Sequence, residues 1–362
     1  MEVFRDLEFT GTVSMNRYIK PLPSTFKSEV ILLLGLTGTG KSNFLEALSG
    51  SSELKISGNS LESVTQDLTL YELVNVHYRS TGRKIFFIDC PGFCDDKTSE
   101  FKLIKMIQEW LNSTSRTKSR DIFADSDDRK IDTILYFHRI TDKRLPSTHK
   151  ETLRLISSLV GDPYQNQTSL AVVTTMWDTL WRPTQLQEAE IRFAQLKENL
   201  KEFLGPIANE ALRFHNTQNS AFHIIDDVDF MCTSSGTWAA VRRGMHRPPL
   251  LIFSDKKLRN APFAEQLAQL IHDRIARLEQ SIRILDDDIL QLEQDENRDS
   301  DVGARNELLG MKTRAQGALH IAIREKADLL AILEPARRPS IRRRVLGYIH
   351  DKFKLSSGSG ER

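Results

Sequence analysis

The chain has 362 residues and a formal net charge of +1, because 50 Lys and Arg side chains stand against 49 Asp and Glu. This balance argues against a protein whose main task is to coat nucleic acid, since neutralising phosphates requires a basic excess. With 40% hydrophobic and 27% charged residues, the composition is that of a globular chain and excludes disorder along its whole length. Three cysteines are too few for a disulfide framework.

The beginning of the sequence lacks the basic start and the apolar core of a secretory signal. No apolar run approaches the ~20 residues that are needed to cross a bilayer. We therefore expect a reducing, cytoplasmic location, with no nucleic acid among the partners.

Changes in composition divide the chain into five segments. An α/β domain is expected where short apolar runs alternate with helical stretches, and a linker is expected where prolines gather. The predicted segments are an N-terminal arm at 1–28, the α/β domain at 29–245, the linker at 246–262, a helical hairpin at 263–334 and a basic tail at 335–362.

Five short runs are the candidate strands of the α/β domain. They are rich in β-branched and aromatic residues and almost continuously apolar, as strands are when helices cover both faces of a parallel sheet. The runs are Val30–Leu34, Lys84–Ile88, Thr133–Phe137, Ser169–Val173 and Ala221–Ile225. The predicted fold class is therefore α/β, with a mainly parallel sheet and helices on both faces.

The first run leads into GLTGTGKS at 35–42, a complete GxxxxGK[ST] phosphate-binding loop between a strand and a helix. Its glycines let consecutive backbone N–H groups turn inward on a polyphosphate. We expect Lys41 to reach the β- and γ-phosphates and the Ser42 hydroxyl to coordinate Mg²⁺. The predicted nucleotide contacts of this segment are Gly35, Thr37, Gly38, Thr39, Gly40, Lys41, Ser42 and Asn43.

A second acidic position follows the next run, in DCPGF at 89–93. The pattern Asp-x-x-Gly resembles the opening of switch II in GTPases, and the form DxPGF is similar to the branch that contains septins, GIMAP GTPases and the Toc receptors of plastid import. The resemblance implies that Asp89 holds Mg²⁺ through water and that the Gly92 N–H senses the γ-phosphate. Taken alone, a strand-end aspartate before a Pro-Gly turn can also be structural.

Switch I of such a GTPase offers a threonine hydroxyl that closes on Mg²⁺ when GTP is bound. Thr65 is the predicted residue, because it lies between the phosphate loop and Asp89. Ser60, Ser63 and Thr69 are the alternatives. The candidate catalytic residues are thus Lys41, Thr65 and Gly92, and the candidate metal ligands are Ser42, Thr65 and Asp89.

Guanine recognition in GTPases uses [NT]KxD at the end of a strand, whose aspartate accepts hydrogen bonds from guanine N1–H and N2–H. The sequence TTMWD at 174–178 places Thr175 and Asp178 at the matching positions, with Met176 in place of the lysine. This departure weakens the match, and a strand-end aspartate can also be a helix cap. Asn216, in RFHN at 213–216, is the candidate that packs on the base from the other side.

DCPGF, TTMWD and FHRITD (137–142) together resemble most closely a set of poorly characterised fungal G-domain proteins related to GIMAPs. The resemblance covers about residues 28–230.

Ras-like enzymes orient the attacking water with a glutamine where this chain has Phe93, so hydrolysis is expected to be slow in the monomer. Relatives of this kind dimerise across the nucleotide face. Arg139, His138 and Arg144 are the candidates for a group supplied by a partner.

Apolar residues at 264–292 repeat with 4-3 spacing, and a weaker repeat follows at 308–332 beyond a polar turn. This pattern predicts two helices in an antiparallel hairpin, packed within one chain or between two.

Residues 336–362 hold eight basic and two acidic side chains. Such a basic tail can contact an anionic membrane surface or an acidic partner, the protein's own hairpin included, or remain solvated.

The first functional hypothesis is a GTP/GDP switch with slow, Mg²⁺-dependent GTP hydrolysis that works through dimerisation of G domains. The alternative is a scaffold that binds nucleotide without turnover and acts through its coiled coil and basic tail. An ATPase or small-molecule kinase is disfavoured by Thr175 and Asp178 and by the lack of an obvious lid.

Overall fold

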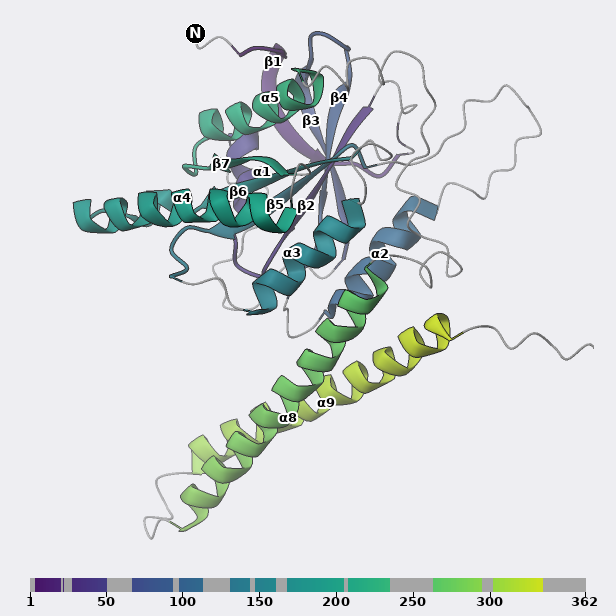
Figure 1. Cartoon of the computed structure of the whole chain (residues 1–362), viewed down its shortest axis with the longest axis vertical. Coiled ribbons are helices and arrows are strands. Elements are labelled where there is room, and N and C mark those ends of the chain that lie inside the picture. Colours follow the sequence, from purple (N-terminus) through teal and green to yellow (C-terminus); the bar gives the residue numbers. More distant parts are fainter. Residues whose placement is uncertain are drawn as a thin grey trace, which may run out of the picture.

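The computed structural model describes residues 4–20, 22, 28–50, 67–93, 98–112, 131–143, 147–160, 168–204, 208–234, 263–294 and 302–334. Over these residues the chain forms a P-loop G domain followed by a pair of long helices (Figure 1). The predicted linker at 246–262 and basic tail at 335–362 lie outside the described residues, and the predicted domain boundaries stay predictions.

A seven-stranded sheet forms the centre of the G domain, in the order β1-β3-β4-β2-β5-β6-β7. Strands β2, β4, β5, β6 and β7 are parallel, whereas β1 and β3 join one edge antiparallel to their neighbours. The strands are β1 (Leu7–Arg17), β2 (Ser28–Gly35), β3 (Thr69–Tyr78), β4 (Lys84–Asp89), β5 (Thr133–Arg139), β6 (Ser169–Thr175) and β7 (Ala208–Arg213).

Helices cover both faces of the sheet because successive residues of the central strands point to opposite sides. Leu32 and Leu34 of β2 lie in a core layer with α2, α3 and α4, while Ile31 and Leu33 lie in a second layer with α1 and α5. These helices are α1 (Lys41–Ser49), α2 (Glu100–Asn112), α3 (Ser147–Val160), α4 (Pro183–Leu204) and α5 (Gln218–Ser234). The predicted fold class is confirmed.

The predicted hairpin is also confirmed. Helices α8 (Ala264–Gln294) and α9 (Val302–Leu333) pack against each other and extend from the G domain (Figure 1). At the end of the hairpin next to the G domain, Leu267 and Leu270 of α8 and Leu329 of α9 are buried in the same core layer as α2 and α3. Arg274 of α8 is buried and donates to the Thr98 carbonyl just before α2, at 3.5 Å. Among the described helices, none combines the length and apolar character that crossing a bilayer requires.

One predicted strand is wrong: Ala221–Ile225 lies within helix α5, and the strand of this region is β7. The apolar side chains of the segment recur at helical spacing, and Ala221, Ile225 and Val228 are all buried against the sheet. Strand β7 reads ANEALR and lacks the apolar run that the prediction relied upon.

The antiparallel strands β1 and β3 were not among the predicted strands. Strand β1 occupies much of the predicted N-terminal arm, so residues 7–17 belong to the sheet. Both strands mix buried and exposed side chains, and each pairing is interrupted by a register shift. Half-exposed strands of this kind give only short stretches of alternation, unlike the continuous apolar runs of the parallel strands.

The start of β1 is anchored to α5 by one carboxylate. Asp226, buried within α5, accepts hydrogen bonds from the backbone N–H groups of Arg5 (2.7 Å), Asp6 (2.8 Å) and Leu7 (3.1 Å). Hydrogen bonds to a charged acceptor are stronger than neutral ones, and removing the acceptor leaves partly buried N–H groups unsatisfied.

We expect Asp226→Ala to lower the free energy of unfolding by about 2–3 kcal/mol, since three backbone donors lose their acceptor together. The neighbouring Asp227→Ala is the control, because Asp227 forms a partly exposed ion pair with Arg5 at 3.3 Å. That pair contributes less than about 1 kcal/mol. Urea unfolding followed by circular dichroism measures both variants. Equal effects would contradict an anchoring role for Asp226.

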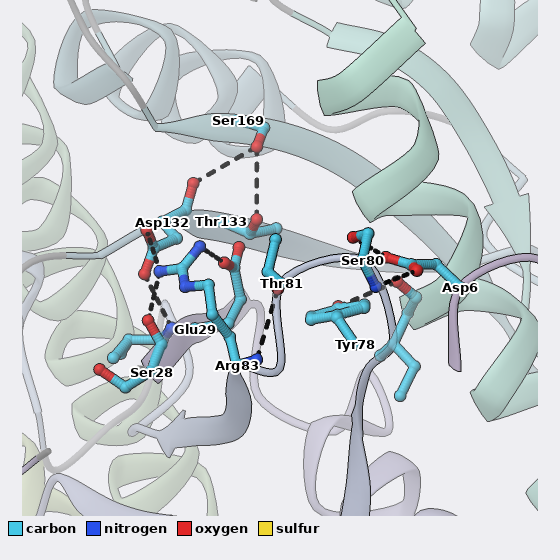
Figure 2. Close-up of polar contacts among 12 residues, drawn as sticks. Asp6, Ser28, Glu29, Tyr78, Ser80, Thr81, Arg83, Asp132, Thr133 and Ser169 are labelled. Atoms are coloured by element: carbon cyan, nitrogen blue, oxygen red, sulfur yellow. Dashed lines mark hydrogen bonds and ion pairs between the residues drawn. The ribbon is translucent and has the colours of Figure 1, made fainter. Parts of the chain in front are cut away.

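A buried polar network holds the amino ends of four adjacent strands, β4, β2, β5 and β6 (Figure 2). Arg83, just before β4, donates to Glu29 and to the Ser28 carbonyl of β2, and to Asp132 at 3.0 Å. Asp132 in turn accepts the Val30 N–H at 2.9 Å. The two carboxylates raise the pKa of the Arg83 guanidinium against the opposing effect of burial. This network lies at the opposite end of β2 from the phosphate-binding loop.

Candidate nucleotide-binding site

The loop between β2 and α1 has the backbone form that a polyphosphate site requires. Gly38 and Gly40 have φ angles of 76° and 87°, which lie in the left-handed region that side chains disfavour. Helix α1 begins directly after Gly40, at Lys41. The free N–H groups of the first helical turn and the positive end of the helix dipole therefore lie at the loop.

The charged and hydroxyl groups of the loop come together as predicted from the motif. Lys41 is 7% exposed, and its ammonium donates back to the loop, to the carbonyls of Leu36 (3.1 Å) and Gly35 (3.4 Å). Ser42 Oγ donates to Asp89 Oδ2 at 3.3 Å, although the two residues are 47 positions apart. A hydroxyl and a carboxylate at this separation are hard oxygen donors, and they fit the ligand preference of Mg²⁺.

The end of the DCPGF segment is paired with the phosphate loop. Phe93 N–H donates to the Gly35 carbonyl at 2.9 Å, and Thr37 N–H donates to the Phe93 carbonyl at 3.1 Å. The Phe93 side chain is buried in the core. Gly92 packs on Thr37 so closely that an added Cβ would lie 2.4 Å from the Thr37 nitrogen. Only glycine fits at position 92 in this arrangement.

The cysteine of the same segment is buried beside the site. Cys90 Sγ donates to the Leu33 carbonyl at 2.8 Å, and burial raises the pKa of its thiol to about 12. Because the thiolate is the reactive form, we expect Cys90 to resist alkylation in the folded protein. Iodoacetamide at pH 8, with and without urea, followed by mass spectrometry of the Cys90 peptide, tests this. Rapid modification without urea would contradict the burial of the thiol.

The predicted switch I residue lies outside the described residues. Thr65 and its alternatives Ser60 and Ser63 fall in the segment 51–66, so their positions relative to Asp89 stay predictions. The fourth residue, Thr69, is in β3 directly opposite Asp89 in the antiparallel pair with β4. It is therefore placed next to the candidate metal site by the sheet itself.

The predicted base-binding residues meet at the carboxyl ends of β6 and β7. Asn216 Nδ2 donates to Asp178 Oδ2 at 3.0 Å, and both residues are exposed. Thr175 Oγ1, buried at the end of β6, donates to the Thr39 carbonyl of the phosphate loop at 2.9 Å. Met176 has a left-handed φ of 63° and receives a weak contact from Thr141 Oγ1 to its sulfur at 4.0 Å.

The three residues predicted as candidates for completing the nucleotide site of a second subunit differ in position. Arg139 ends β5, is bound to Asp142 at 3.2 Å, and has a guanidinium nitrogen 4.0 Å from where a Cβ on Gly38 would lie. His138 is buried in the sheet, so its ring is not accessible to a second subunit. Arg144 lies outside the described residues.

Sequence reasoning missed a cluster of side chains around the base-binding loop. Trp177, Phe193, Arg213 and Glu190 pack together directly behind Asp178 and Asn216. The only signal in the sequence was that Trp177 and Arg213 belong to the two recognised motifs, TTMWD and RFHN. Within the described residues, no group of three or more His, Cys, Asp or Glu side chains is arranged to hold a metal ion.

A mainly parallel sheet with GLTGTGKS at the carboxyl end of a central strand, and an aspartate at the end of its neighbour, defines a P-loop nucleotide-binding protein. Residues 30–161 match the family described as 50S ribosome-binding GTPase. The matched segment runs from β2 to α3 and includes the phosphate loop and Asp89. This part of the chain is therefore similar to the GTPase domain of that family over residues 30–161.

Similar solved structures include Toc33 from Arabidopsis thaliana with GDP and Mg²⁺, at 19% identity and a TM-score of 0.37, covering 53% of this chain and 72% of Toc33. Toc33 with Mg²⁺ and GMPPNP has 18% identity and a TM-score of 0.39, covering 57% and 85%. A mutation variant of SsGBP has 12% identity and a TM-score of 0.33, covering 56% of each chain. None of the curated proteins matches the chain.

Proposed function

We propose that the protein binds GTP and hydrolyses it slowly to GDP with Mg²⁺, and that its nucleotide state controls its assembly. The observation that carries this proposal is the placement of two sites on one edge of the sheet. Lys41, Ser42 and Asp89 lie at the phosphate loop, and Asp178 with Asn216 lies at the ends of β6 and β7. Thr175 joins them, since its hydroxyl bonds the loop at Thr39.

At the phosphate end, the loop N–H groups and the α1 N-terminus bind the polyphosphate. Lys41 exchanges its carbonyl partners for the β- and γ-phosphates and balances their charge. Ser42 and Asp89 would hold Mg²⁺, Asp89 through water, and Thr65 would be a further ligand for the ion. The metal, when bound, withdraws charge from the phosphates. Gly92, already packed on the loop, offers its N–H to the γ-phosphate.

At the base end, the Asp178 carboxylate accepts hydrogen bonds from guanine N1–H and N2–H. In the structure one of its oxygens accepts from the Asn216 amide, so a donor group already occupies this position. Adenine has an unprotonated N1 and no 2-amino group, and it cannot satisfy the carboxylate. Rejection of an analogue that leaves a charged group unsatisfied is strong.

Slow turnover follows from the residue after Gly92. Phe93 is buried and replaces the glutamine that positions water in Ras-like enzymes. We further propose that two G domains pair across the nucleotide face and that Arg139 contributes to the pair. Its guanidinium stands beside the phosphate loop, where a cation stabilises transferring phosphate. The basic tail is proposed to add contact with an anionic membrane or an acidic partner.

The test of guanine recognition is Asp178→Asn. An amide in place of the carboxylate donates to the 2-oxo group of xanthine, so GTP affinity should fall about 100-fold while XTP affinity rises. Calorimetry with GTP, GDP, ATP and XTP in Mg²⁺ measures the change. Asp273→Asn, on α8, is the control and should bind as the wild type does. A preference of the wild type for ATP would overturn the proposal.

The test of the switch uses the same samples on a sizing column. A shift to dimer with GMPPNP but not with GDP is the expected result. Equal elution in both states, with GTP bound but never hydrolysed, would favour the scaffold instead.

A further inference from the structure

An ion pair between Arg213 and Glu190 lies next to the two loops that carry Asp178 and Asn216. Arg213, the last residue of β7, donates from both terminal nitrogens to the two carboxylate oxygens of Glu190 on α4, each at 2.7 Å. Such two-bond pairs fix the plane of the guanidinium as well as its position. An exposed lysine in this place would supply charge without that orientation.

The guanidinium plane is held against two aromatic rings. Its central carbon lies 4.7 Å from the centre of the Trp177 ring and 4.3 Å from that of Phe193. Trp177 and Phe193 themselves meet edge to face at 5.6 Å, and both are buried. Cation–π contacts at this distance are favourable, and they strengthen as water is excluded.

This stack fixes the residue that precedes the base-reading aspartate. Trp177 Nε1 donates to Thr174 Oγ1 at 3.0 Å, and the same hydroxyl donates to the Leu212 carbonyl of β7 at 2.8 Å. The indole is thus bonded at one end and covered by Arg213 on its face. Little freedom is left to Asp178, the next residue along the chain.

Arg213 therefore connects both halves of the base site. It belongs to the strand whose loop carries Asn216, three residues further on, and it packs on the tryptophan beside Asp178. Asp178 and Asn216 meet at 3.0 Å. The loop needs such support, because Met176 holds a left-handed φ of 63° and brings no charge where the usual motif has lysine.

We infer that Arg213 is a positioning residue for guanine recognition, which holds the Trp177–Asp178 loop against the Asn216 loop through its stack and its pair with Glu190. The inference rests on the proposed function, because it concerns the same base site. Arg213 acts through Trp177 and does not itself contact the nucleotide.

The experiment compares Arg213→Met and Arg213→Lys with wild type in calorimetry with Mg²⁺, using GDP, IDP, ADP and tripolyphosphate. IDP lacks the 2-amino group of guanine, so the ratio of GDP to IDP affinity reports the position of the Asp178 carboxylate. Arg213→Met should lower this ratio about tenfold. Arg213→Lys keeps the charge but not the paired bonds, so its ratio should lie between those of Arg213→Met and the wild type. Tripolyphosphate affinity should not change, because the phosphate loop is untouched.

Arg154→Met is the matched control, since Arg154 makes an exposed pair with Glu151 on α3. It should leave every affinity as in wild type. An unchanged GDP to IDP ratio in folded Arg213→Met would overturn the inference, and so would a parallel loss of tripolyphosphate binding, which marks general destabilisation. A wild type that prefers ADP to GDP would overturn the proposed function and this inference with it.

Discussion

Replacing Arg83 by Met should lower the free energy of unfolding by about 3–5 kcal/mol, because two carboxylates then stay buried without their cation. Glu29 and Asp132 are both almost fully buried, and both are bound by the Arg83 guanidinium (Figure 2). Met has a similar length but offers no donor. Urea unfolding at pH 7, followed by circular dichroism, measures the loss.

The substitution Lys84→Met controls for loss of a positive charge at the next residue along the chain, the first residue of β4. Lys84 pairs with Glu72 at 2.8 Å, but its side chain is 59% exposed. Such a pair contributes less than about 1 kcal/mol. Adding Glu29→Gln and Asp132→Asn to Arg83→Met should recover part of the stability, since the uncompensated charges are then removed. A loss below about 1 kcal/mol in Arg83→Met would contradict the network's role.

Gly92→Ala should separate the DCPGF segment from the phosphate loop. An added Cβ would lie 2.4 to 2.5 Å from the backbone nitrogen, Cα and Oγ1 of Thr37, and a backbone neighbour cannot give way by rotating. The two hydrogen bonds that join Phe93 to the loop are then lost. We expect a cost of about 2–5 kcal/mol in unfolding free energy. Single-turnover GTP hydrolysis should fall at the same time.

Gly82→Ala is the matched control for this substitution. Gly82 has a left-handed φ of 64°, and no atom lies within 4 Å of the position of its Cβ. The change therefore imposes backbone strain alone, about 1 kcal/mol, and should not alter hydrolysis. Thermal melts and GTP turnover of both variants separate steric contact from strain. If the two substitutions cost the same, close packing of Gly92 on Thr37 is not what limits position 92.

The sequence predicted best where one short segment carries both structure and chemistry. The run before Gly35 is apolar throughout because β2 is covered on both faces, and GLTGTGKS follows it directly. The proximity of Ser42 and Asp89 could be predicted from the sequence, because parallel strands end at the same edge of a sheet. Asp178 and Asn216 were both named as base-binding candidates from resembling motifs, but the strand that brings Asn216 to Asp178, β7, was not among the predicted strands.

Prediction failed where local pattern and tertiary environment disagree. The segment Ala221–Ile225 is short and apolar, and a buried strand and the buried face of a helix share these features. In the structure this segment packs against the sheet as part of helix α5. Strands β1 and β3 were missed because an antiparallel edge leaves one face partly exposed and erases the continuous run.

The sequence by itself determined the phosphate loop, the acidic residue beside it, the order of apolar strands and the heptad spacing of the hairpin. These are properties of neighbouring residues, and their physical causes act over a few positions. The tertiary structure alone decided which distant side chains share a site. Arg83 meets Asp132, Arg213 covers Trp177 and Gly92 packs on Thr37 because the sheet brings separate strand ends together, and no spacing along the chain encodes those distances.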